Sequence, residues 1–185
     1  MSLFSPGNPA RPVCRPMGSI EGPRAIRDPV GRLIVSACPF AIVKKLSTVR
    51  ERLAGCYILA DHATAYIGES EMIGRRFSEH AGDPSMGFAL EAYVIHAQQP
   101  EALSRRALLY LQHRLTDIAK KAGLVEVSNN ASPQAFQWSD EERAIYEHFV
   151  GDSLRLLFDA GCRVFHSNFV SQLSGVEIGV SADDA

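Results

Sequence analysis

Four side chains in the middle of the chain have types and spacings that suit hydrolytic chemistry. Tyr57 and Tyr66 stand in two apolar segments that follow each other closely. Arg76 comes ten residues after Tyr66, and His80 comes four residues after Arg76. Residues four apart share one face of a helix, so Arg76 and His80 can act together if their segment is helical. The tyrosines can approach each other if their segments pair as a hairpin.

Such a set fits hydrolysis of a phosphodiester. That reaction requires a deprotonated water, neutralisation of the charged transition state and assistance to the departing oxygen. A tyrosine has a pKa near ~10, so it would need a nearby cation to take part as a base. Arg76 could be that cation and could also clamp the phosphate with its planar guanidinium, while His80 could bond a phosphate oxygen or a tyrosine hydroxyl. The structural alternative is a pair of half-buried sheet tyrosines beside a solvated helix face.

The elements that must position these residues are a hairpin and a short helix. Residues 55–60 and 65–68 are apolar runs separated by a short turn, a pattern that predicts paired strands. Residues 71–80 have helical periodicity, and residues 88–97 predict a third strand of the same sheet.

Further elements follow from periodicity and capping signals. Residues 101–122 carry a long apolar stripe that predicts a helix, and Gly123 ends it. Ser139 with Glu142 three residues later forms a capping box that opens another helix. The remaining expected elements are a strand at 32–38, a helix from Pro39 to Gly55 and a terminal strand at 163–165.

The hairpin motif resembles that of the GIY-YIG nuclease family. Gly55-Cys56-Tyr57 stands for Gly-Ile-Tyr, and Tyr66-Ile67-Gly68 supplies the second half. Cysteine is a mild replacement because the middle residue should face the core. Over about residues 30–165 the chain is similar to a bacterial subgroup of small GIY-YIG proteins, in which a segment like LYLQHRLTDIAKKAGLVEVSNN is typical.

The resemblance implies an α/β (α+β) fold, with a small, mainly antiparallel sheet flanked by helices. It implies endonuclease action on DNA phosphodiester bonds with Mg²⁺ or Mn²⁺ as cofactor. DNA would be bound with weak sequence preference, since no zinc finger or helix-turn-helix is appended. The catalytic residues it implies are Tyr57, Tyr66, Arg76 and His80, and the site-supporting residues are Gly55, Gly68, Asn129 and Asn130.

The chain departs from the family at the metal ligand. Gln112 occupies the position of the glutamate that holds the metal ion, and an amide keeps the shape of that side chain without its charge. A hard divalent cation would lose most of its attraction to the protein there, unless Glu91 or Glu69 replaces the ligand. Two functions stay open: an endonuclease with impaired metal binding, and a catalytically inactive relative that binds nucleic acid or a protein partner.

Composition bounds the rest of the chain. Its 185 residues, 46% hydrophobic and 22% charged, predict one domain over 25–166, after a flexible Pro/Gly-rich leader at 1–24 and before a frayed tail at 167–185. Residues 1–50 hold eight basic and two acidic residues, against eleven and nineteen in the remainder. This basic N-terminal region indicates either a polyanionic partner or a solvated tail.

No run approaches the ~20 apolar residues of a membrane span. Scattered cysteines and no apolar signal core predict a cytoplasmic protein.

Overall fold

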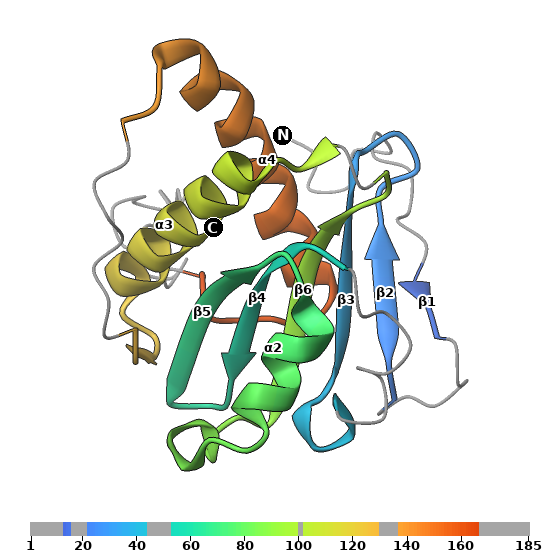
Figure 1. Cartoon of the computed structure of the whole chain (residues 1–185), viewed down its shortest axis with the longest axis vertical. Coiled ribbons are helices and arrows are strands. Elements are labelled where there is room, and N and C mark those ends of the chain that lie inside the picture. Colours follow the sequence, from blue (N-terminus) through green and yellow to red (C-terminus); the bar gives the residue numbers. More distant parts are fainter. Residues whose placement is uncertain (1–12, 16–21, 44–52, 100–101, 130–136, 167–185) are drawn as a thin grey trace, which may run out of the picture.

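A seven-stranded sheet forms the centre of the part of the chain that the structure describes (Figure 1). This computed structural model describes residues 13–15, 22–43, 53–99, 102–129 and 137–166. The strands are β1 (Val13–Cys14), β2 (Arg24–Arg27), β3 (Leu33–Pro39), β4 (Gly55–Ala60), β5 (Thr64–Ser70), β6 (Glu91–Ala97) and β7 (Glu126–Val127). The helices are α2 (Ile73–His80), α3 (Arg105–Ala122) and α4 (Asp140–Asp159), with 3₁₀ turns at Phe40–Ile42 and Pro84–Met86.

The strand order is β1-β2-β3-β6-β4-β5-β7, and every neighbouring pair is antiparallel except β5 with β7. The predicted fold class is therefore confirmed: an α+β protein with a mainly antiparallel sheet and flanking helices. The predicted hairpin is also present, since β4 pairs with β5 along its whole length. The third expected strand, β6, pairs with β4 on its other side.

Helices cover the two faces of the sheet, and each face has its own apolar core. Helix α2 packs on one face, over a core that includes Tyr57, Leu59, Val94 and Phe77. Helices α3 and α4 cover the other face (Figure 1), where Cys56, Ile58, Ile67, Ile95 and the buried leucines of α3 form the larger core. All six residues of β4 are buried because helices lie on both of its sides.

The ends of the long helices follow local signals in the sequence. The Ser104 side chain accepts a hydrogen bond from the N–H of Ala107 and caps the start of α3. Gly123 ends α3 with a φ of 64°, in the left-handed region that favours glycine. The predicted capping box is present at α4, where Ser139 and Glu142 bond each other's backbone N–H reciprocally.

Three segments differ from expectation or lie outside the description. The predicted strand at 163–165 was wrong: Val164 and Phe165 are buried against the larger core, but the hydrogen bonds there are local turn bonds, such as Cys162 N–H to Leu157 C=O. Strands β1 and β2 were not predicted, and β1 lies within the expected leader. Most of the expected helix between Pro39 and Gly55, most of the leader and the tail at 167–185 lie outside the described residues.

Candidate functional site

The register of the hairpin places both motif tyrosines on the same face of the sheet. Tyr57 lies opposite Gly68, and Leu59 lies opposite Tyr66, so the tyrosines are diagonal neighbours. Alternate residues of a strand share a face, which here is the face that α2 covers. The centroids of the two tyrosine rings are 6.1 Å apart.

The glycines of the motif are required by close packing. A Cβ at position 68 would lie 2.3 Å from the Tyr57 hydroxyl oxygen, because the Tyr57 ring crosses directly over Gly68. A Cβ at position 55 would lie 2.6 Å from the carbonyl oxygen of Ile95 on β6. Cys56 between them is fully buried in the core under α3, as predicted for the middle residue of the motif.

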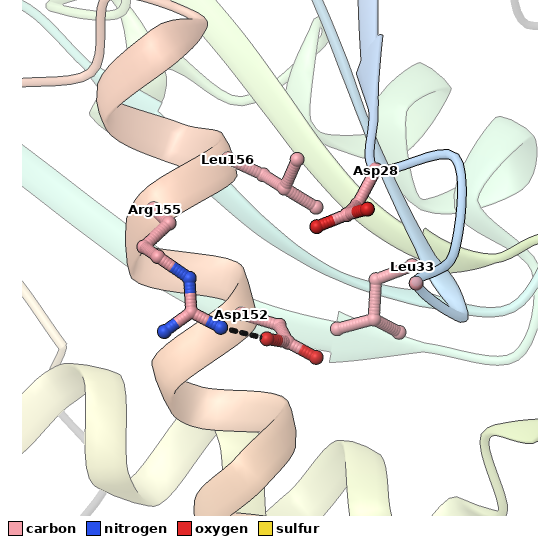
Figure 2. Close-up of a pocket in the computed structure, with 6 residues that line it drawn as sticks. Asp28, Leu33, Asp152, Arg155 and Leu156 are labelled. Carbon is pink, nitrogen blue, oxygen red and sulfur yellow. Dashed lines mark hydrogen bonds and ion pairs between the residues drawn. The ribbon is translucent and has the colours of Figure 1, made fainter. Parts of the chain in front are cut away.

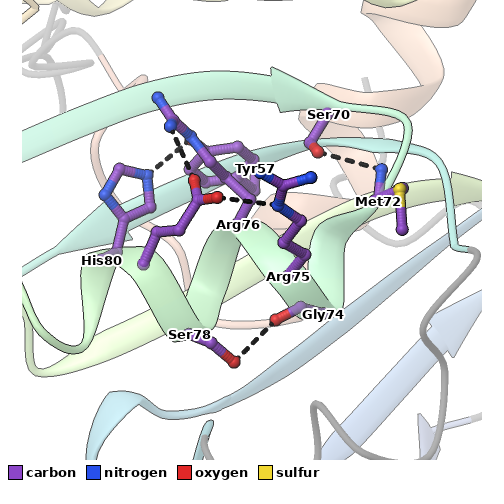
Figure 3. Close-up of polar contacts among 9 residues, drawn as sticks. Tyr57, Ser70, Met72, Gly74, Arg75, Arg76, Ser78 and His80 are labelled. Atoms are coloured by element: carbon purple, nitrogen blue, oxygen red, sulfur yellow. Dashed lines mark hydrogen bonds and ion pairs between the residues drawn. The ribbon is translucent and has the colours of Figure 1, made fainter.

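Helix α2 brings Arg76 and His80 to the Tyr57 hydroxyl (Figure 3). The Tyr57 oxygen lies 2.7 Å from Nε2 of His80 and accepts a hydrogen bond from Nε of Arg76 at 3.3 Å. The Tyr66 ring packs on the His80 ring, with centroids 5.2 Å apart. The four predicted catalytic residues therefore form one cluster, called here the tyrosine cluster.

Burial controls the protonation states in the tyrosine cluster. Burial raises the pKa of Tyr57, and the hydrogen bond from Arg76 only partly offsets this. Burial lowers the pKa of His80, with the positive charge of Arg76 acting in the same direction. At neutral pH both groups are therefore uncharged. Because the guanidinium can only donate, the Tyr57 oxygen accepts from Arg76, and its own proton can be donated to a neutral His80 Nε2.

Exposure divides the cluster into an inner and an outer part. Tyr57 is 0% exposed and His80 is 5% exposed, whereas the Arg76 side chain keeps 42% of its surface. Tyr66 is half-buried. A ligand arriving from solvent would thus meet Arg76 and Tyr66 first, with Tyr57 and His80 behind them. The raised pKa of Tyr57 runs opposite to what a general base at neutral pH requires.

Sequence reasoning missed one charged neighbour of this cluster. The carboxylate of Glu79 accepts a hydrogen bond from Nη1 of Arg76 at 3.1 Å and another from Nε of Arg75 at 3.0 Å. The signal was available, since Glu79 stands three residues after one arginine and four after the other, the spacings of neighbours on a helix.

Gln112 reaches the motif strand but bonds its backbone. Its Nε2 donates to the carbonyl oxygen of Ile67 at 3.3 Å. The Asn129 side chain holds the same residue at both ends: it accepts from Ile67 N–H at 2.9 Å and donates to Ile67 C=O at 2.5 Å. We call this set the amide clamp. Asn130, the other predicted supporting residue, lies outside the described residues.

The two glutamates considered as replacement metal ligands lie elsewhere. Glu91 forms an ion pair with Arg24 at 3.0 Å, and strand alternation places it on the face opposite the tyrosine cluster. Alternation places Glu69 on that opposite face too, and burial raises the pKa of its carboxyl group, opposed by the charge of Arg105. Within the described ranges, no group of three or more His, Cys, Asp or Glu side chains could hold a metal ion. At position 112 the chain offers a neutral amide in place of a carboxylate.

A pocket lies away from these residues, between α4 and the turn that joins β2 to β3 (Figure 2). Asp28, Leu33 and Leu156 line it together with Asp152 and Arg155, which form an ion pair with each other. None of the predicted site residues contributes to it.

Comparisons with known proteins leave the family open. No family model, no curated protein and no solved structure matches the chain. Among the helices that the structure describes, none has the length and apolar character needed to cross a membrane.

Proposed function

We propose that this chain is a GIY-YIG-like domain that binds DNA at its phosphodiester groups, with hydrolysis impaired by the amide at position 112. The observation that carries the proposal is the Tyr57 hydroxyl, which is bonded by both Arg76 and His80. Side chains from strand β4 and helix α2 meet there, at the centre of the hairpin motif.

Arg76 is the group best placed to bind a phosphate. Its Nε is held from behind by Tyr57, which orients the guanidinium plane, while 42% of the side chain remains exposed. A guanidinium presents several N–H groups in a fixed fork that matches phosphate oxygens. In this proposal Tyr57 and His80 position Arg76, and the Tyr66 hydroxyl adds a second contact to the phosphate.

The alternative is a catalytically inactive relative that binds nucleic acid or a protein. It is favoured by the amide clamp, since Gln112 donates to a backbone carbonyl at the place where the family carries a carboxylate. The endonuclease and an inactive DNA-binding relative share the phosphate-binding surface and differ only in turnover, whereas a protein-binding relative does not need that surface. We therefore derive no reaction step through a metal ion.

One residue of the basic N-terminal region, Arg24, is engaged by contacts inside the protein and is not open to DNA. Arg24 is largely buried, since its Nε donates to the carbonyl of Ala160 and its Nη2 pairs with Glu91. Arg27 and Arg32 are exposed and are available for contacts with phosphates. Salt-dependent binding through these residues and Arg76 is the expected behaviour.

Titration of labelled duplex and branched DNA at increasing salt tests the proposal. We expect affinity to fall steeply with salt, with weak sequence preference. Arg76→Ala should weaken binding about tenfold, the scale of one lost charge-assisted hydrogen bond. Arg143→Ala on α4 removes the same charge from an exposed i,i+3 ion pair and is the matched control. No binding at low salt, by wild type and by Gln112→Glu, would favour the protein-interaction alternative.

A further inference from the structure

The anion-binding face of α2 already has a carboxylate on it. Glu79 bridges two arginines, with Oε1 accepting from Arg75 and Oε2 accepting from Arg76. All three side chains are partly exposed, at 73% for Arg75, 42% for Arg76 and 44% for Glu79. Figure 3 shows both arginines on α2, with the Tyr57 ring next to Arg76 and His80 to its left.

We propose that Glu79 is an intramolecular competitor, which occupies the arginine pair until a DNA backbone phosphate displaces it. This inference rests on the proposed function and adds its regulation. A carboxylate and a phosphate offer the same chemistry to a guanidinium, namely two oxygen acceptors with negative charge. Glu79 therefore holds Nη1 of Arg76, one of the outward groups that would bind the phosphate.

The ion pairs of Glu79 with Arg75 and Arg76 can be broken at little cost in free energy. An ion pair between exposed side chains is weak, because water competes for both partners and ordering them costs entropy. Among the described residues, both ion-pair partners of Glu79 lie on α2 itself, so the bridge does not join α2 to another element. Glu147 is different: it accepts from Tyr110 and Arg114 of α3 and so joins α4 to α3. Release of Glu79 leaves the fold and the Tyr57–Arg76 bond in place.

The test compares DNA affinities of charge-neutralised variants of the full chain. Glu79→Gln should bind labelled duplex about two- to fivefold more tightly than wild type at low salt, the scale of one exposed ion pair. Glu71→Gln is the matched control, because it removes the same charge from a nearby exposed residue that pairs with Arg105. In an Arg76→Ala background, Glu79→Gln should bring a smaller gain than in the wild type, because only Arg75 is then left for it to release.

The outcomes separate this inference from the proposed function. Equal affinities of wild type and Glu79→Gln, or an equal gain from Glu71→Gln, would overturn the competitor role while Arg76-dependent binding still stood. Titration with inorganic phosphate is the second probe. A phosphate affinity that rises in Glu79→Gln, without DNA binding by any variant, would support the competitor and overturn the DNA proposal. No gain with either probe overturns the competitor role.

Discussion

The tyrosine cluster and the amide clamp lie at the same strand and differ in what their polar groups bond. On the side that α2 covers, side chains bond side chains, and Arg76 keeps exposed N–H groups. At Ile67, by contrast, the side-chain amides bond the strand backbone and bring no net charge. The tyrosine cluster thus keeps a charged side chain exposed to solvent, whereas the polar atoms of the amide clamp are already bonded to the backbone of the sheet.

The difference has a structural cause at the end of β7. That strand pairs with β5 only at Thr64 and Ala65, which leaves the N–H and C=O of Ile67 without a strand partner. Backbone groups that lack partners are costly inside a protein. Asn129 supplies a donor and an acceptor in one side chain and thereby continues the ladder for one more residue. Gln112 adds a second donor to the same carbonyl.

The largest expected effect is that of Gly68→Ala, which disturbs the tyrosine cluster alone. The added methyl group would overlap the fully buried Tyr57 ring and push its hydroxyl away from His80. We expect a loss of about 1–3 kcal/mol in the free energy of unfolding, the range for overpacked cores. Urea titration measures the loss. Gly82→Ala, whose Cβ would meet nothing closer than 3.6 Å, is the control that should change stability little.

Asn129→Ala should have the next largest effect, by breaking the amide clamp. Both polar groups of Ile67 lose a partner, for an expected cost of about 1–3 kcal/mol. Gln112→Ala removes a single long bond and should cost less. Because the clamp acts on the backbone and the tyrosine cluster on side chains, DNA affinity of the folded variant should change little. A loss of affinity as large as that of Arg76→Ala would show that the two regions are coupled.

Gln112→Glu replaces a neutral amide of the clamp with a negatively charged carboxylate. The carboxylate would face the Ile67 carbonyl oxygen that Gln112 now bonds, so without metal we expect stability to fall by about 1 kcal/mol. A divalent ion that binds this carboxylate would restore stability by mass action. Mn²⁺ or Mg²⁺ should therefore raise the melting temperature of the variant and leave that of the wild type unchanged.

Cleavage assays on the same proteins decide between the two forms of the proposed function. Wild type should cleave DNA poorly or not at all, and Gln112→Glu should gain metal-dependent cleavage. The double variant Gln112→Glu/Arg76→Ala should lose that gain, because the phosphate clamp is missing. Strong metal-dependent cleavage by purified wild type would contradict the proposal that hydrolysis is impaired. If Gln112→Glu cleaves neither duplex, nicked nor branched DNA, the inactive relative is favoured.

The smallest expected effect is the pH dependence of stability that His80 contributes. Its pKa is lowered by burial and by Arg76, so the unfolded chain binds the proton more readily than the folded one. The stabilisation is fully present above the unfolded value of ~6.5 and is lost as the pH falls through the folded pKa. His80→Gln should flatten this slope in unfolding titrations. His62→Gln, in the exposed turn of the hairpin, should retain it.

Local sequence patterns were enough to predict the hairpin, the end of α3 at Gly123, the start of α4 after Ser139 and the tyrosine cluster, whereas α3 begins at Arg105 and not at the expected residue 101. Alternation along two short strands puts Tyr57 and Tyr66 on one face, and a spacing of four puts Arg76 beside His80 on a helix. These are short-range relations, so the pattern of neighbouring residues is enough to specify them. The Ser139 capping box is a further case, because its bonds join residues three apart.

Only the tertiary structure decided what each polar group bonds. The hydrogen-bond partner of Gln112 depends on where β7 ends and on which carbonyl of β5 therefore lacks a partner on β7. Neither can be predicted from the residues around position 112. Burial of Tyr57 in the core beneath α2 sets the direction of its pKa shift, against the effect that Arg76 alone would have. Val164 and Phe165 pack into the core as a turn, although their short apolar run resembles a strand. In each case the deciding contacts come from segments distant in the chain, whose arrangement local patterns do not encode.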